Sequence, residues 1–241
     1  MIASGPLPID LLPGMDGTGE LLADLRGRLS PHRPVTVVAY PTDQPLGHEA
    51  LAAFVSDRLP EGRFVILGES FSGPIAIEIA ARMPERVAGL VLASTFARHP
   101  LPRALVHAIP LVDVARLPRR LIEGLLLGRH GTPKLKAQLA AILAKLPRGV
   151  MQARARDTLQ VDVRARLRAI VCPALCLVGR HDRLIGRRCV ADLRSGLRDA
   201  TFVEFDAPHM LLETHAAEAA SAIERFCATL IAHRRGRESG V

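Results

Sequence analysis

The sequence predicts an α/β protein built on a mostly parallel central sheet that is flanked by helices. The first observation behind this prediction is that short apolar runs alternate with segments of helical period along most of the chain. The second is that several of these runs, such as VAGLVLA at Val87–Ala93, are apolar without a break, as is typical of strands covered on both faces of a parallel sheet. The 241 residues, of which 49% are hydrophobic, fit one domain with a sizeable core.

The individual elements follow from the apolar pattern of the chain. We expect strands at Leu7–Leu12, Val35–Tyr40, Phe64–Leu67, Val87–Ala93, Ala174–Val178 and Thr201–Phe205. We expect helices at Glu20–Leu29, His48–Leu59, Pro74–Met83, Arg187–Leu197 and Ala216–Ile231. Because the run Val35–Tyr40 is continuously apolar, we expect it to be buried on both faces. The charged segment 234–241 is predicted to be a disordered tail.

The alternating pattern is interrupted between Arg98 and Arg168. This stretch is rich in leucine, arginine and proline, and no convincing buried strand divides it. Its segment Lys134–Leu146 places apolar residues at helical spacing. We therefore predict a helical lid at 98–168, inserted over the C-terminal edge of a sheet whose core is formed by 1–97 and 169–233. The alternative is a set of ordinary surface helices.

Charge and composition argue against a dedicated nucleic-acid protein. The formal net charge is +8, but only three of the basic residues are lysines, and the arginines are spread along the chain. Aromatic residues make up 3% of the sequence and tryptophan is absent, so a stacking platform for single strands is not expected. No nucleic-acid-binding motif is present. The charge is compatible with non-specific binding of anions.

The four cysteines indicate a reducing compartment. Cys172 and Cys176 are expected on one strand, roughly 13 Å apart, which is too far for a disulfide. The spacing of cysteines and histidines does not resemble a metal site, so we expect no metal. No apolar run is long enough to span a bilayer, and the first residues lack the charged leader of a secretion signal. We expect a cytoplasmic protein.

One stretch combines an expected strand, a tight turn and a helix, namely Arg63–Met83 with the sequence RFVILGESFSGPIAIEIAARM. Small residues surround Ser70 in GESFSG, which allows a sharp turn that presents the hydroxyl at the C-terminal edge of the sheet. The following helix directs backbone N–H groups and its positive end to the same place. A nucleophile for acyl transfer belongs at such a turn. Ser72 stands where glycine is usual, and this turn alone does not exclude an ordinary loop.

A serine nucleophile needs a base to take its proton and a carboxylate to orient that base. Asp182 follows one of the later expected strands and His209 follows the next, so both fall on the same edge of the sheet as Ser70. Asp206 is too close in sequence to His209 to reach around its ring easily. The loop after Val87–Ala93 offers no carboxylate, so Asp182 is the strongest candidate for the acid.

These motifs together resemble the α/β-hydrolase-fold serine hydrolases, particularly esterase-like or thioesterase-like members with a helical lid. The matching pieces are LLPGMDGTG, GESFSG, LVGRHDRLI and APHMLLETHAAEAASAIERF, which extend from Leu7 to Phe226. The chain order serine, aspartate, histidine is also that of the family. The resemblance implies a Ser70, His209 and Asp182 triad.

The same resemblance implies an oxyanion hole with two backbone N–H donors. One is Phe71, directly after the nucleophile, and the other by alignment is Met15. The family often has His-Gly before this second donor, whereas this chain has Pro13-Gly14, so the shape of that loop is open. Asp16 is expected to brace the loop, and Glu69 to pack or hydrogen-bond under the turn.

The implied function is hydrolysis of a carboxylic ester or thioester of a small to medium substrate through an acyl-enzyme, without a cofactor. Acyltransferase, lactonase and C–C hydrolase activities use the same groups and stay open, as does a non-catalytic ligand-binding role. Two further histidines fall near the expected site. His181 is expected to point away or to line the pocket, and His215 to lie on the surface.

Overall fold

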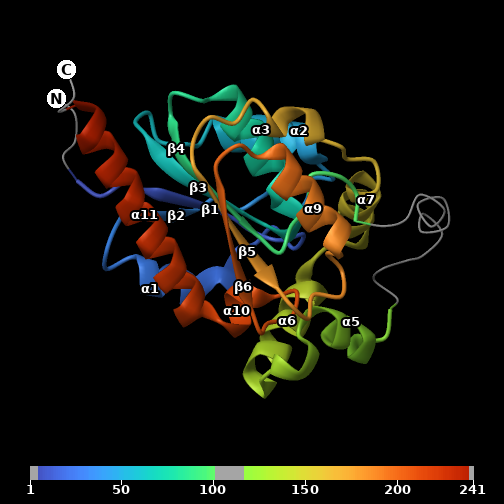
Figure 1. The fold of residues 1–241 in the computed structure, drawn as a ribbon. Coiled ribbons are helices and arrows are strands. Elements are labelled where there is room, and N and C mark those ends of the chain that lie inside the picture. Colours follow the sequence, from blue (N-terminus) through green and yellow to red (C-terminus); the bar gives the residue numbers. More distant parts are fainter. Residues whose placement is uncertain (1–4, 101–116, 239–241) are drawn as a thin grey trace.

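The computed structural model describes residues 5–100 and 117–238, and one parallel sheet lies at its centre (Figure 1). The strands are β1 (Ile9–Leu12), β2 (Val35–Val37), β3 (Phe64–Glu69), β4 (Val87–Ala93), β5 (Ala174–Gly179) and β6 (Ala200–Phe205). Across the sheet they run in the order β2-β1-β3-β4-β5-β6, and every neighbouring pair is parallel. The predicted α/β class with a mostly parallel sheet is confirmed.

Helices cover both faces of this sheet. One face packs against α1 (Ala23–Leu29), α10 (Leu211–Thr214) and α11 (Ala216–Glu238), and the other against α2 (His48–Ser56), α3 (Gly73–Arg82), α8 (Arg164–Leu167) and α9 (Arg187–Gly196). Successive side chains of a strand point to opposite faces. Accordingly, Val65 and Leu67 of β3 join the α1 and α11 layer, while Phe64 and Ile66 join the α2 and α3 layer. Two apolar layers explain why the central strands are apolar without a break.

Two expectations about the ends of the fold differ from the structure. The strand expected at Val35–Tyr40 ends at Val37 and is only partly buried, because β2 is the outermost strand and pairs with β1 alone. The buried Val38 and Tyr40 lie in the loop after β2 and pack into the apolar layer of α2 and α3. The last helix continues to Glu238, through most of the expected disordered tail, since each residue added to an existing helix gains a hydrogen bond. Among the described residues, no helix has the length and apolar character to cross a bilayer.

The segment between β4 and β5 is helical in its described part. It contains α5 (Arg119–Leu126), the 3-10 turn η5 (Gly128–His130), α6 (Pro133–Lys145), α7 (Arg148–Thr158) and α8. In Figure 1, α5 and α6 lie beside α10, near the ends of β5 and β6. Leu127 and Leu139 of this segment form an apolar cluster with Met210, so the segment reaches the C-terminal edge of the sheet. Residues 101–116 of the predicted lid lie outside the described residues.

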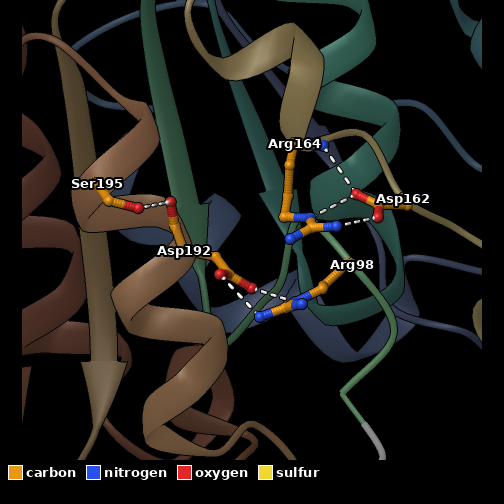
Figure 2. Close-up of polar contacts among 5 residues, drawn as sticks. All are labelled: Arg98, Asp162, Arg164, Asp192 and Ser195. Atoms are coloured by element: carbon orange, nitrogen blue, oxygen red, sulfur yellow. Dashed lines mark hydrogen bonds and ion pairs between the residues drawn. The ribbon is translucent and has the colours of Figure 1, made fainter. Parts of the chain in front are cut away.

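The two ends of this inserted segment are fastened to each other and to the core (Figure 2). Arg98 and Asp162 form an antiparallel bridge. The Arg98 guanidinium donates to both carboxylate oxygens of Asp192 in α9, at 2.5 and 3.0 Å. Asp162 in turn accepts from the Arg164 side chain at 2.8 and 2.6 Å. The inserted segment therefore leaves and rejoins the core at one place.

Candidate active site

The turn after β3 holds Ser70 in a strained conformation. Ser70 has a φ of 47°, which a residue with a side chain rarely adopts. The two glycines on either side of the turn, Gly68 and Gly73, have no room for a side chain. A Cβ on Gly68 would lie 2.6 Å from the Ser72 carbonyl oxygen, and one on Gly73 would lie 1.9 Å from Thr95 Oγ1. The sharp turn predicted from GESFSG is therefore present, with Ser70 partly exposed at the end of the strand.

Ser70, His209 and Asp182 form a row in which His209 lies within hydrogen-bond distance of each of the other two. Ser70 Oγ is 2.8 Å from His209 Nε2, and His209 Nδ1 is 2.8 Å from Asp182 Oδ2. Asp182 follows β5 and His209 follows β6, so neighbouring parallel strands deliver both to the edge where β3 ends. The imidazole and the carboxylate are almost fully buried, with side-chain exposures of 6% and 3%. A hydroxyl, a base and an acid aligned in this way can perform nucleophilic acyl transfer.

The orientation of the Asp182 carboxylate is fixed by its own loop. Its Oδ1 accepts hydrogen bonds from the backbone N–H groups of Leu184 and Ile185, both at 2.8 Å. The other oxygen, Oδ2, is thereby left to face His209. Because a carboxylate only accepts, Nδ1 of His209 carries the proton and Nε2 faces the serine as an acceptor.

The loop after β1 is compact and rigidly hydrogen-bonded. Gly17 N–H donates to the Gly14 carbonyl, and the Asp16 carboxylate accepts from both the backbone and the hydroxyl of Thr18. Asp16 thus braces the loop from within, as the sequence suggested. Met15 sits in this loop, and Phe71 is buried directly after Ser70.

Ser72 connects the nucleophile turn to the loop after β1. Its hydroxyl donates to the Pro13 carbonyl, and it also contacts the Tyr40 hydroxyl. Ser72 is fully buried, and burial raises the pKa of Tyr40 above its ordinary value. Ser72, which stands where glycine is usual, therefore makes hydrogen bonds that glycine could not make.

A buried pair of carboxyl groups lies beneath the turn. Glu69 and Glu213 of α10 contact each other, and burial raises the pKa of both, that of Glu213 to about 7. Ionising both carboxyl groups at once is unfavourable, since like charges at this distance repel strongly in an apolar environment. Glu69 was expected under the turn, but Glu213 was not. It resembles an ordinary residue of a helix start, and only the fold shows what it faces.

The other polar residues near the edge pair away from Ser70. His181 Nε2 is 2.6 Å from Asp206 Oδ1, and Arg129 donates to the other oxygen of Asp206 at 2.7 Å. The ring of His215 lies 5.0 Å from that of His130. Asp206 therefore serves His181 and not His209. His181 lies exposed, and His215 is only partly buried.

Three further polar residues near the site were not predicted from the sequence. His48 of α2 and Arg154 and Asp157 of α7 make hydrogen bonds around the nucleophile turn and the loop after β1. They carry no local motif, and Arg154 is one arginine among many in its segment. Their roles depend on contacts between parts of the chain about 110 to 140 residues apart, which no sequence window contains.

Comparison with known proteins defines the class. Residues 7–222 match the model of the alpha/beta hydrolase family, and the chain belongs to that family. A curated relative is the pimeloyl-[acyl-carrier protein] methyl ester esterase of Chromobacterium violaceum. It is 29% identical over 164 residues, which are 62% of this chain and 64% of that protein. The match thus spans somewhat less than two thirds of the relative's length.

Solved structures share the fold across nearly the whole chain. The enol-lactonase from Burkholderia xenovorans LB400 is 20% identical, with a TM-score of 0.80 and coverage of 94% of this chain and 92% of that one. The esterase EaEST from Exiguobacterium antarcticum is 13% identical, with a TM-score of 0.80 and coverage of 94% and 93%. A bromoperoxidase from Bacillus anthracis is 15% identical and reaches the same TM-score, covering 93% and 92%. At these identities the likeness establishes the α/β-hydrolase fold and leaves the reaction to the site.

Proposed function

We propose that the protein is a serine hydrolase that cleaves a carboxylic ester or thioester of a small to medium substrate through an acyl-enzyme. The observation that carries the proposal is the hydrogen-bonded row of Ser70, His209 and Asp182, with 2.8 Å at each junction. The esterase named among the relatives supports the same bond class. The free, buried cysteines fit a reducing compartment, and we propose the cytoplasm.

Each step of the proposed reaction has a group in place. His209 Nε2 takes the proton of Ser70 as Oγ attacks the carbonyl carbon, and the negative charge of the tetrahedral intermediate falls on the former carbonyl oxygen. The backbone N–H groups of Met15 and Phe71 stabilise that charge. His209 then returns the proton to the leaving alcohol or thiol. Water, activated by His209, releases the acid from Ser70.

Asp182 keeps His209 in the tautomer that the reaction requires, and it stabilises the imidazolium that forms during each step. The helices inserted between β4 and β5 act in this proposal as a lid over the site. Their contact with Met210, the residue after His209, supports that placement.

Acyltransferase, lactonase and C–C hydrolase reactions remain alternatives on the same groups, since they differ only in the acceptor or the bond broken. An ester of a carrier-bound acyl chain is a specific candidate, because the curated relative is named for one. A non-catalytic binding role is disfavoured by the base within hydrogen-bond distance of Ser70.

The test is a substrate panel run on the wild type and on Ser70→Ala. The panel comprises p-nitrophenyl esters of increasing acyl length, acyl-CoA thioesters and lactones, with and without an alcohol acceptor. We expect ester or thioester hydrolysis by the wild type and a fall of about 10⁴–10⁶ in its rate for Ser70→Ala. A folded wild type that hydrolyses none of these compounds would refute the proposal. Turnover that Ser70→Ala retains would refute the role of Ser70.

A further inference from the structure

Arg154 of α7 is a buried cation with an unusual set of partners. Its side chain is fully buried, and its two terminal nitrogens donate only to carbonyl oxygens. Nη1 donates to Met15 at 2.8 Å and to Asp16 at 3.0 Å, and Nη2 donates to Pro41 at 2.8 Å. Burial lowers the pKa of Arg154, which reflects the unfavourable free energy of placing a charge there. The guanidinium thus holds the backbone around Met15 in place.

One turn further along α7, Asp157 acts on the other side of the site through His48. The Asp157 carboxylate accepts from His48 Nδ1 and, at 2.7 Å, from the His48 backbone N–H. The opposite ring nitrogen, Nε2, lies 3.0 Å from the Phe71 carbonyl oxygen. Burial raises the pKa of Asp157, but the hydrogen bonds and charge of His48 outweigh it, so the net pKa is lowered.

The His48 ring links Asp157 to the turn that carries Phe71. A carboxylate and a carbonyl oxygen are both acceptors, and the two ring nitrogens of His48 face one each. Its ring also packs against that of Phe71, with a centroid distance of 4.3 Å. Phe71 is therefore held by the contact of His48 with its carbonyl and by ring contact together.

Two glycines leave the room that these α7 side chains occupy. Gly17 has a φ of +74°, and a Cβ there would lie 2.5 Å from Arg154 Nη1. Gly47 directly precedes α2, and a Cβ there would lie 2.7 Å from Asp157 Oδ1. The loop after β1 and the start of α2 thus approach α7 more closely than any other residue at these positions would permit.

We propose that Arg154, and Asp157 through His48, are positioning residues that hold the two oxyanion donors, Met15 and Phe71, in place. The inference rests on the proposed function, because it gives a role to the same site. An i, i+3 spacing puts Arg154 and Asp157 on one face of α7, from which each secures the carbonyl of one donor residue. Oxyanion stabilisation depends on donors that are preorganised, and a displacement of about 1 Å can cost about a hundredfold in rate.

A consequence is that the inserted segment takes part in building the oxyanion hole. Neither Met15 nor Phe71 lies in that segment, yet Arg154 of α7 contacts Met15 directly and Asp157 of α7 reaches Phe71 through His48 of α2. Proper docking of α7 therefore becomes a condition for stabilising the tetrahedral intermediate, beyond any covering of the substrate.

The experiment compares Arg154→Met and Asp157→Asn with Arg156→Met, a matched control in which an exposed arginine on the same helix is changed. Rates are divided by the number of active sites, counted by complete titration with a fluorophosphonate. For each variant kcat and KM are measured with a p-nitrophenyl ester, and the inhibition constant is measured for a trifluoromethyl ketone. That ketone forms a tetrahedral adduct whose oxyanion needs the hole, so its affinity reports the hole directly.

We expect kcat per active site to fall about 10–10²-fold in Arg154→Met and less in Asp157→Asn, with KM within about threefold. The inhibition constant of the ketone should rise by the same factor as kcat/KM falls, and Arg156→Met should match the wild type. A further variant, Arg154→Ala, removes the guanidinium together with most of the side chain. Millimolar ethylguanidinium should partly restore kcat in this variant, whereas it would not restore a purely structural loss.

Two results would overturn the inference while the wild type stays active. One is that kcat per active site stays within twofold in both variants. The other is that kcat falls while the affinity for the ketone is unchanged. If Arg154→Met does not fold, Asp157→Asn, which keeps size and an acceptor oxygen, decides the question alone. A wild type without hydrolysis and without labelling would instead remove the proposed function, and this inference with it.

Discussion

Asp182→Asn is the substitution from which the geometry predicts the most specific outcome. Oδ1 of Asp182 accepts from two backbone N–H groups, those of Leu184 and Ile185, each at 2.8 Å. An amide placed here must keep its oxygen at that position, because its NH₂ group cannot accept. The NH₂ group is thereby turned toward His209 Nδ1, where the wild type has an acceptor oxygen.

The consequence is a change of tautomer in His209. Nδ1 must then accept from the amide, so the ring proton moves to Nε2 and the nitrogen facing Ser70 can no longer take a proton. In serine proteases the equivalent change lowers kcat by about 10⁴, which corresponds to about 5 kcal/mol of transition-state stabilisation. We expect a loss of similar size here, with KM nearly unchanged and the fold intact.

The assay is the steady-state hydrolysis of a p-nitrophenyl ester, normalised to folded protein by circular dichroism. Asp206→Asn is the matched control, because Asp206 is an exposed carboxylate on a neighbouring loop that serves His181. We expect this control to keep wild-type kcat. An Asp182→Asn enzyme within tenfold of the wild type, or a comparable loss in Asp206→Asn, would refute the assignment of the acid.

Three other outcomes follow from burial and hydrogen bonding. Burial raises the pKa of Asp10 to about 6, so ionising it in the folded state is unfavourable, and the free energy of unfolding should fall by about 3 kcal/mol as the pH rises from about 4 through 6. Asp10→Asn should remove this loss, as urea titrations at pH 4 and pH 8 would measure; an identical pH dependence would contradict it. Burial raises the pKa of all four cysteine thiols to about 11 or 12, so iodoacetamide at pH 7.5 should leave activity unchanged, and rapid inactivation would be inconsistent with the structure. Ser72→Ala should cost about 1–3 kcal/mol of stability, measured by thermal denaturation, because it leaves the Tyr40 hydroxyl and the Pro13 carbonyl buried without their partner. Unchanged stability in Ser72→Ala would show that water replaces the hydroxyl.

The sequence predicted well what depends on local pattern. The strand Val87–Ala93 agrees with the structure residue for residue, and the turn at Ser70 lies where its small neighbours placed it. Chain order and parallel topology were enough to expect Asp182 and His209 at one edge, because the ends of parallel strands meet there.

The sequence-based prediction was wrong where an apolar residue can be buried by more than one kind of neighbour. The run Val35–Tyr40 was expected inside the sheet, yet its later part lies in the loop after β2 and is buried in the apolar layer of α2 and α3. Local pattern reports burial but not which neighbour provides it. The same limit concealed Arg154, whose buried guanidinium has no signature among the exposed arginines around it.

The proposed reaction requires that the Ser70 hydroxyl is the nucleophile. The most direct measurement is peptide mapping by mass spectrometry after the folded wild type has reacted with a fluorophosphonate at pH 7.5. We expect one adduct per chain, on the peptide that carries Ser70, and none in His209→Ala over the same time. An adduct on another residue, or equal labelling without the imidazole, would contradict it.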